Sequence, residues 1–317
     1  MTANATARLL HSSTLAETAL DLPELINSKL DTVRRMRAVH RRYDEIMDSI
    51  IFKRRQLMRN TPSDELPHDF LQVVLSKETA EDPHERLSVQ EVKGIIADIL
   101  AGGIHTSAAT IEWGMTQLLR KRACMQKLQE EVDGVMKGKE GQQVTDEAAA
   151  TMPYLEKVVK EILRLHPVVP MLPPRMSNQD CKVGEYSIPK GTQAIVNAWA
   201  IARDPALWGD TAQEFMPERF DEKQVELSAG QHFELLAFGS GRRICPGLRL
   251  GLSIVHVTIA NLVHAYNWSA PPSALLAASS LDLSENPSTL TNTKATPLLA
   301  IPTPRHPPPS LFSLSAA

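Results

Sequence analysis

Residues 238–247 constrain the fold of this chain more than any other stretch of its sequence. They read FGSGRRICPG, so three glycines and one proline fall within ten positions. Such a segment is unsuited to the interior of a helix or strand, because glycine costs conformational entropy and proline lacks the amide donor. The apolar periodicity that follows predicts a helix over residues 247–268. The chain must therefore present a tight loop, with Cys245 in it, at the start of a helix.

Cys245 has a distinctive chemical setting in that loop. The helix dipole and the free N–H groups of a first helical turn stabilise negative charge, and Arg242 and Arg243 add positive potential. A thiolate held in this way is a nucleophile or a soft metal ligand. As a nucleophile it would need a base such as His232, although no base or oxyanion arrangement stands at a telling spacing. An inert, buried cysteine is the remaining alternative.

Composition places the chain among soluble globular proteins. Of its 317 residues 43% are hydrophobic and 22% are charged, and the net charge is -3, so no nucleic acid or other strongly charged partner is expected. Its three cysteines form no CxxC pair, which argues against a disulfide framework. Residues 1–21 contain no recognisable secretory signal, and no apolar run reaches the ~18 residues that a transmembrane helix requires. The chain by itself is therefore expected to be cytoplasmic.

The pattern along the chain predicts a mainly α fold with a small β-sheet region. Helices are expected over residues 22–56, 88–119, 121–135, 152–165 and 247–268, with a short helix near Asp146. The first helix has a basic face, which is typical of a solvated surface or, alternatively, of contact with a membrane or an acidic partner. Ser88 and Glu91 have the spacing of a capping box. Residues 181–201 predict short strands, whereas residues 203–237 look irregular.

Two adjacent glycines, Gly102 and Gly103, fall inside the predicted helix 88–119. Together they cost roughly 2 kcal/mol relative to alanine in a helix interior. Tight packing against another helix would explain them, and so would the close approach of a ligand. These residues alone leave both interpretations open.

Four motifs in a fixed order resemble those of the cytochrome P-450 family. The heme-binding signature F-x-x-G-x-R-x-C-x-G is matched by Phe238, Gly241, Arg243, Cys245 and Gly247. Upstream, Glu161 and Arg164 match the family's E-x-x-R helix. Residues 217–220 match its PERF segment, and residues 102–107 resemble the oxygen-binding part of its long central helix. The sequences that flank these motifs are most similar to those of the land-plant branch of the family.

The resemblance implies the C-terminal two-thirds of the cytochrome P-450 fold, without the family's N-terminal anchor and first helices. Residues 1–270 would form a single helix-rich heme domain, and residues 271–317 would add a β and loop segment with a Pro-rich tail to that domain. Full-length family members lie on the cytosolic face of the endoplasmic reticulum membrane. Contact with a membrane surface is therefore a further expectation.

The same resemblance implies a set of cofactor residues. Cys245 is expected to be the axial ligand of the iron of heme b, because a thiolate ligand favours O–O cleavage. Arg243 and, as a second candidate, Arg175 would pair with the heme propionates. The other cofactor-binding positions that it implies are Phe238, Gly241, Gly247 and Gly103.

Glu161, Arg164 and Arg219 are expected, by the resemblance, to form a buried ion network that locks the cysteine-containing loop. Their role would be structural and not catalytic. On spacing alone, Glu161 and Arg164 could instead form an exposed pair within one helix.

In the family's central helix an acid followed by a threonine relays protons to bound dioxygen. Thr106 fits the threonine, whereas His105 stands where the acid is usual. Histidine exchanges protons near neutral pH and could take the relay role. The alternative is that His105 is a bystander or impairs oxygen activation.

The implied activity is that of a heme-thiolate monooxygenase of plant secondary metabolism. One atom of dioxygen would enter a small apolar organic substrate, and electrons would come from NADPH through a partner flavoprotein reductase. The chain itself contains no G-x-G-x-x-G nucleotide loop. The alternative is a truncated, non-catalytic product of the same fold that holds no heme.

Overall fold

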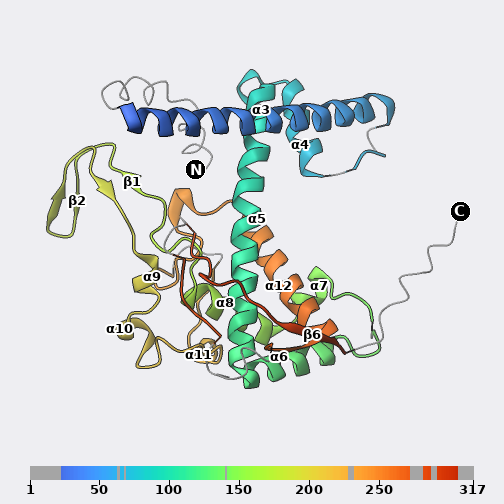
Figure 1. Ribbon diagram of the computed structural model, residues 1–317, viewed down its shortest axis with the longest axis vertical. Coiled ribbons are helices and arrows are strands. Elements are labelled where there is room, and N and C mark those ends of the chain that lie inside the picture. The colour runs from blue at the N-terminus through green and yellow to red at the C-terminus, as the bar shows by residue number, and fades with distance from the viewer. Residues whose placement is uncertain are drawn as a thin grey trace, which may run out of the picture. The chain divides into compact units, whose positions relative to one another are not determined.

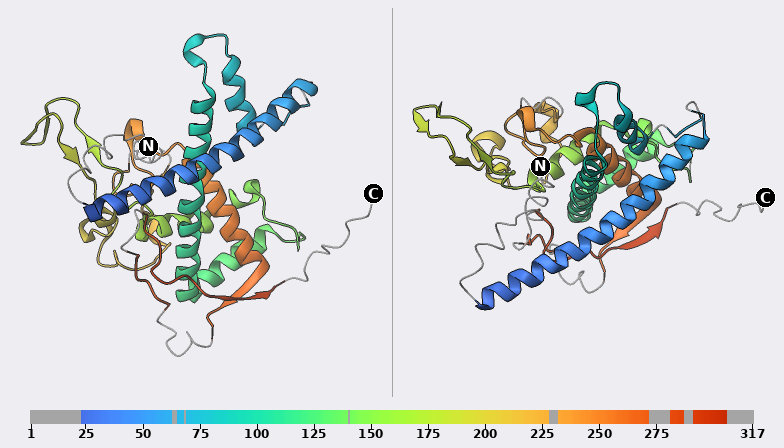
Figure 2. Two further views of the ribbon diagram at one scale, coloured as in Figure 1. Left: turned by 45° about the horizontal axis from the view of Figure 1, so that its top comes forward. Right: turned by 90° about the horizontal axis from the view of Figure 1, so that it is seen from above.

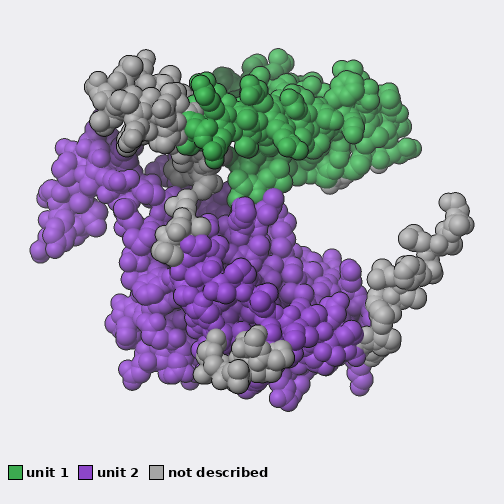
Figure 3. All heavy atoms as spheres, in the orientation of Figure 1, with its two compact units in different colours: residues 1–102 green, residues 103–317 purple. Residues whose placement is uncertain are grey.

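The computed structural model describes residues 23–62, 65–67, 69–139, 141–227, 232–271, 281–286 and 291–305, without the side chains of residues 23–30. This part of the chain is mainly helical with three small antiparallel strand pairs, so the predicted fold class is confirmed (Figure 1). The chain divides into two compact units, residues 1–102 and 103–317, which Figure 3 colours separately. Residues 1–21 and the Pro-rich tail lie outside the described residues. The domain boundary expected after residue 270 stays a prediction.

The first unit is built on one long helix. Its elements are α3 (Pro23–Asn60), α4 (Phe70–Ser76), the 3-10 turns η1 (Lys77–Thr79) and η2 (Pro83–Glu85), and the start of α5 (Val89–Arg120). Their apolar core contains Ile51, Val74, Leu75 and Val92. The predicted helix 22–56 is thus confirmed, and it continues to Asn60.

Two bidentate ion pairs fasten α3 to the segment that follows it. Arg54 donates through both Nη atoms to the carboxylate of Asp69. Arg55 binds Glu78 in the same bidentate way. Both arginines are only partly exposed, so these pairs are better shielded from solvent than the other cations of the basic face.

Helix α5 begins with the predicted capping box. The Ser88 N–H donates to Glu91 Oε2 at 2.8 Å, and the Glu91 N–H donates to Ser88 Oγ at 3.3 Å. The helix continues through Gly102 and Gly103 without interruption. A Cβ at either glycine would meet no atom within 4 Å. Packing among the described residues therefore does not require the two glycines, and the approach of a ligand is the interpretation that stays open.

The core of the second unit lies where four helices meet. They are the C-terminal part of α5, α6 (Arg122–Val135), α8 (Pro153–Leu165) and α12 (Leu248–Ala265), and the short α7 (Asp146–Ala149) packs on α12 (Figures 1 and 2). A Cβ on Gly114 would stand 2.6 Å from Ile162 Cδ1 and 3.1 Å from Ile259 Cδ1. Gly114 therefore allows α5, α8 and α12 to approach one another closely.

The strands form separate pairs and not one small sheet. β1 (Arg175–Met176) pairs with β4 (Gln193–Ala194), β2 (Cys181–Val183) with β3 (Tyr186–Ile188), and β5 (Tyr266–Ser269) with β6 (Ile301–Pro304). The last predicted helix needs correction, because α12 ends at Ala265 and the expected final turn forms β5. The segment predicted as irregular contains α10 (Pro205–Trp208) and α11 (Arg219–Glu222), and α9 (Ala198–Ile201) precedes it.

Two described helices, α5 and α12, are long and apolar enough to cross a membrane by length and composition alone. Each also supplies fully buried core residues, Trp113 and Leu118 from α5 and Ile259 and Val263 from α12. Core helices of soluble proteins pass the same test, so it carries little weight here. The expected absence of a transmembrane helix stays a prediction.

Candidate functional site

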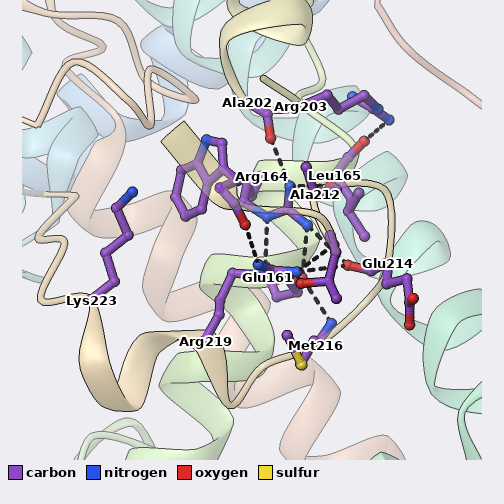
Figure 4. A network of polar contacts seen from close by, with 12 residues as sticks. Glu161, Arg164, Leu165, Ala202, Arg203, Ala212, Glu214, Met216, Arg219 and Lys223 are labelled. Carbon is purple, nitrogen blue, oxygen red and sulfur yellow. Dashed lines mark hydrogen bonds and ion pairs between the residues drawn. The ribbon is translucent and has the colours of Figure 1, made fainter. Parts of the chain in front are cut away.

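Helix α8 places Glu161 and Arg164 on one face, and both side chains are 0% exposed (Figure 4). Arg164 Nε donates to Glu161 Oε2 at 2.8 Å, and Nη2 donates to Oε1 at 2.9 Å. The remaining guanidinium N–H groups donate to the main-chain carbonyls of Ala202, Ala212 and Glu214 at 2.7, 2.7 and 3.0 Å. Every N–H donor of this arginine therefore has an acceptor, as burial of the charge requires. The exposed-pair interpretation is wrong.

Arg219, on α11, completes the predicted trio. Its Nε donates to both oxygens of Glu161 at 3.0 and 3.1 Å, and its Nη atoms donate to main-chain carbonyls. The Met216 N–H adds a bond of 2.8 Å to Glu161 Oε1. One buried carboxylate thus holds two guanidiniums and one amide, and carbonyl dipoles face the excess positive charge.

Two contributors to this network carry no signal in the sequence. The Met216 N–H is a main-chain donor, which any residue except proline supplies. The ring of Trp208 lies 5.1 Å from the guanidinium carbon of Arg164 in a cation–π contact. A tryptophan many residues away in the chain could be matched to Arg164 only from the fold.

The contacts of the network reach the cysteine loop (residues 238–247) indirectly. Trp208 and Phe220, which flank the network, pack in an apolar cluster with Leu235, and Ala237 lies against the same cluster. Ala237 immediately precedes the loop. This packing gives a physical route by which the ion network could hold the loop in place, and the locking role itself stays a prediction.

The cysteine loop is closed by its own main chain. The Cys245 N–H donates to the Phe238 carbonyl at 3.0 Å. Gly239 and Gly241 adopt φ values of 72° and 70°, in the left-handed region where a side chain would be strained. Cys245 stands just before α12 as an exposed free cysteine, so the inert buried interpretation is wrong.

Two arginines belong to the cysteine loop or contact it. Arg243 belongs to the 3-10 turn η3 (Gly241–Arg243) of the loop, and it is exposed. Arg175 on β1 is also exposed, and its Nη2 makes a long hydrogen bond of 3.5 Å to the Ser240 carbonyl. The structure thus places both predicted arginines beside the loop that carries Cys245. The cationic groups favour an anionic ligand group at this surface.

Phe238 and Gly247 frame the loop on the side of α12. The Phe238 ring is half-buried against the core, and its Cε1 would lie 3.8 Å from a Cβ placed on Gly251. A Cβ on Gly247 would lie 3.8 Å from the Cys245 sulfur, an ordinary contact distance. Gly247 is therefore not required by contact with the sulfur alone, and its cofactor-binding role stays a prediction.

The residues predicted to act on oxygen lie together on α5. Gly103 and His105 are exposed and Thr106 is half-buried. The Thr106 carbonyl accepts a hydrogen bond of 2.9 Å from the Thr110 hydroxyl, which belongs to the helix itself. The proton-relay roles of His105 and Thr106 stay predictions.

The histidine considered as a hydrolase base has a different neighbour. His232 Nδ1 lies 3.5 Å from Glu234 Oε1. Among the described residues, no hydrogen bond joins His232 to the sulfur of Cys245. The hydrolase interpretation therefore gains no support from the site.

A comparison with known proteins identifies the family. The sequence model of the family described as Cytochrome P-450 matches residues 5–286. This chain belongs to the cytochrome P-450 family. It is 37% identical over 278 residues to a flavonoid 3',5'-hydroxylase of Crocosmia x crocosmiiflora, a match that covers 86% of this chain and 50% of that relative. It is 39% identical over 283 residues to the dimethylnonatriene synthase of Zea mays, with 86% and 52% covered.

A third relative supports the plant-type assignment. Over 203 residues the chain is 43% identical to cytochrome P-450 71A22 of Arabidopsis thaliana, with 64% of this chain and 41% of the relative covered. The chain spans about half the length of the curated relatives that it matches. Among solved structures, a zebra fish cytochrome P-450 with progesterone superposes with a TM-score of 0.72 and 24% identity, covering 87% of this chain and 60% of that one. The fold is therefore the cytochrome P-450 fold.

The side chains of this cytochrome P-450 site fit the heme that the family implies. Cys245 offers an exposed, free thiol, which is a soft ligand suited to iron. Arg175 and Arg243 offer exposed guanidiniums that match carboxylates such as the propionates. A Cβ on Gly103 would meet no atom within 4 Å, so the described residues do not fill the space directly beside this glycine of α5.

Proposed function

We propose that this chain acts as a plant-type heme-thiolate monooxygenase, in which Cys245 would hold the heme iron through its thiolate. The observation that carries the proposal is the exposed thiol at the start of α12, on a loop that is closed by its own main chain, contains Arg243 and is contacted by Arg175. Bound there, heme supplies an iron centre that activates dioxygen and inserts one oxygen atom into an organic substrate. The protein supplies the ligand, the orientation and the protons.

Each residue of the site has a definite part in the proposal. Arg175 and Arg243 would hold the propionates of the heme through charge-assisted hydrogen bonds. Thr106 offers its hydroxyl on α5, and the exposed His105 precedes it in the helix as the second candidate for the proton relay. Phe238, Gly241 and Gly247 keep the cysteine loop in its tight turn.

The substrate and the redox partner follow from the family and its plant relatives. We propose a small apolar organic metabolite as the substrate, in keeping with relatives named as a flavonoid hydroxylase and a dimethylnonatriene synthase. Electrons would come from NADPH through a flavoprotein reductase at the cytosolic face of the endoplasmic reticulum membrane.

The spectrum of the reduced carbon monoxide adduct tests the proposal. The purified chain, supplemented with heme, is expected to show the red-shifted Soret band of thiolate ligation. Cys245→Ser should abolish that band, whereas Cys181→Ser, which changes an exposed cysteine on β2, should leave it intact. A Soret band at the position of non-thiolate heme proteins would contradict the ligand assignment. Protein that stays colourless would select the heme-free alternative.

The roles of His105 and Thr106 need a separate measurement on the heme-loaded enzyme with a reductase. If His105 relays protons, both His105→Ala and Thr106→Ala should lower the product formed per NADPH consumed. Unchanged coupling in His105→Ala together with lost coupling in Thr106→Ala would make His105 a bystander.

A further inference from the structure

A second buried polar cluster lies where α8 ends, and the proposed function does not use it. His166, Arg203 and Asn292 belong to three distant parts of the sequence, and they are 4%, 8% and 4% exposed. Each has one buried polar side-chain atom without a hydrogen-bond partner among the described residues: His166 Nδ1, Arg203 Nη1 and Asn292 Oδ1. A buried polar atom without a hydrogen-bond partner is destabilising, because it has lost its bonds to water without replacing them. Three in one cluster therefore indicate a shared partner.

The three residues meet where the chain leaves α8. The Asn292 N–H donates to the Val168 carbonyl at 2.7 Å, and Arg203 Nη2 donates to the Leu165 carbonyl. Leu165 and Val168 flank His166 on its two sides. Asn292 and Arg203 are thus both bonded to the main chain within two residues of the histidine.

A single carboxylate oxygen joins two of the three residues. Glu285 Oε1 accepts from Asn292 Nδ2 at 2.9 Å and lies 3.8 Å from Arg203 Nη2. Burial lowers the pKa of His166, and the positive charge of Arg203 lowers it further, which is consistent with the guanidinium lying close to the imidazole. The three residues that carry the unsatisfied atoms therefore lie close to one another.

The chemistry of these atoms defines what can bind between them. Arg203 Nη1 can only donate. Asn292 Oδ1 can only accept, and its identity is fixed because Nδ2 must face the Glu285 carboxylate. Gln117 Nε2 lies 2.8 Å from His166 Nε2, so the amide donates to that nitrogen and the proton of the neutral ring is on Nδ1. The bound group must therefore accept two hydrogen bonds and donate one.

We propose that one buried water molecule occupies this region and bridges His166, Arg203 and Asn292. Water accepts from two donors and donates to one acceptor, whereas chloride cannot donate and a metal cation cannot accept. The site is rigid on one side, because the His166 ring stacks on Trp113 with centroids 4.0 Å apart and an interplanar angle of 4°. The water thereby fixes the direction in which the chain leaves α8 toward Arg175.

A crystal structure of the protein at a resolution that shows ordered water tests the proposal directly. Density for one water within hydrogen-bonding distance of all three atoms is expected. A bromide soak distinguishes the rival anion, because an exchangeable chloride would be replaced by bromide and give an anomalous peak. That peak, or density in which the three side chains bond to one another directly, would overturn the proposal.

Magnetic relaxation dispersion of water in solution gives an independent measurement. The wild-type protein should show long-lived internal water, and Asn292→Leu should lose the contribution of one molecule. Asn178→Leu changes an exposed asparagine and serves as the matched control, with no loss expected. If Asn292→Leu does not fold, His166→Phe retains the stacking on Trp113 and should show the same loss. An unchanged dispersion in the folded variant would contradict the proposal.

Discussion

Glu161 shows how much one buried carboxylate can control. It accepts hydrogen bonds from Arg164, Arg219 and the Met216 amide, so Glu161→Gln leaves two guanidiniums without a counter-charge. We expect a loss of about 3–5 kcal/mol in the free energy of unfolding, measured by urea denaturation. The control is Glu156→Gln on the same helix, whose side chain is 57% exposed in its pair with Lys160 and should cost less than about 0.5 kcal/mol. Equal losses in the two variants would contradict the assignment.

His166 makes stability depend on pH. Burial, and then the charges of Arg203, Lys294 and Arg164, lower its pKa from 6.5 to about 3. The unfolded chain therefore takes up a proton below pH 6.5 that the folded chain refuses, so the stability present above pH 6.5 is lost as the pH falls toward 3.

Between pH 7 and pH 5 this residue alone should remove about 2 kcal/mol. His166→Phe should flatten the pH dependence of the unfolding free energy by that amount, whatever its effect at pH 7. A variant that keeps the slope of the wild type would show that another group causes it.

At the residue scale the sequence indicated the charged members of the ion network but not their main-chain partners. The E-x-x-R spacing placed Glu161 and Arg164 on one helical face, and the PERF motif pointed to Arg219. The carbonyls of Ala202, Ala212 and Glu214 could not be predicted, because every residue has a carbonyl and only the fold selects which one faces the guanidinium.

At the scale of elements, Gly114 decides how closely three helices pack. The Cβ of Gly114→Ala would press on Ile162 Cδ1 at 2.6 Å, so we expect this variant to lose about 1–3 kcal/mol despite the better helix propensity of alanine. Ile162→Val removes that terminal methyl. It should therefore cost less stability in the Gly114→Ala background than it costs in the wild-type protein.

Gly134→Ala on α6 is the matched control for Gly114→Ala. A Cβ at Gly134 would meet no atom within 4 Å, so this exposed helix position should gain about 0.5–1 kcal/mol. Thermal unfolding of Gly114→Ala, Ile162→Val, their double variant and Gly134→Ala would measure these differences in stability. A gain in stability for Gly114→Ala would show that α5 is not tightly packed at this point.

The end of α12 shows that the local hydrophobic pattern does not determine where a helix ends. The apolar periodicity runs on past Ala265, and it predicted a helix to Trp268. Residues 266–269 instead pair with residues 301–304, which lie far along the chain. A strand made by so distant a partner leaves little signal in its own short sequence, since tertiary pairing overrides the local preference.

At the scale of the whole molecule, each unit has its own core. Ile51 belongs to the core of residues 1–102, and Ile162 belongs to that of residues 103–317. Ile51→Ala should therefore weaken amide-exchange protection mainly in α3 and α4, and Ile162→Ala mainly in α8 and α12. Hydrogen exchange read by mass spectrometry would separate the two patterns. Equal loss throughout the chain after either change would mean that both units unfold as one.

The family motifs predicted the members of the heme site better than they predicted its geometry. The cysteine loop, both arginines and the oxygen-binding stretch were all identified from short patterns. The contact between Arg175 and the Ser240 carbonyl could not be, because it depends on where β1 lies beside the loop. In the sequence, only the glycine pair itself coincides with the division of the chain into two units at Gly102 and Gly103.

Because Arg164 binds the main-chain carbonyls of Ala202, Ala212 and Glu214 and not their side chains, these three residues can change in evolution without loss of the hydrogen bonds. Substitution there would leave the acceptors unchanged, whereas no other side chain could replace the guanidinium. Selection on this contact therefore acts on Arg164 and not on the residues whose carbonyls it binds. Orthologous sequences should accordingly differ freely at Glu214 while retaining Arg164.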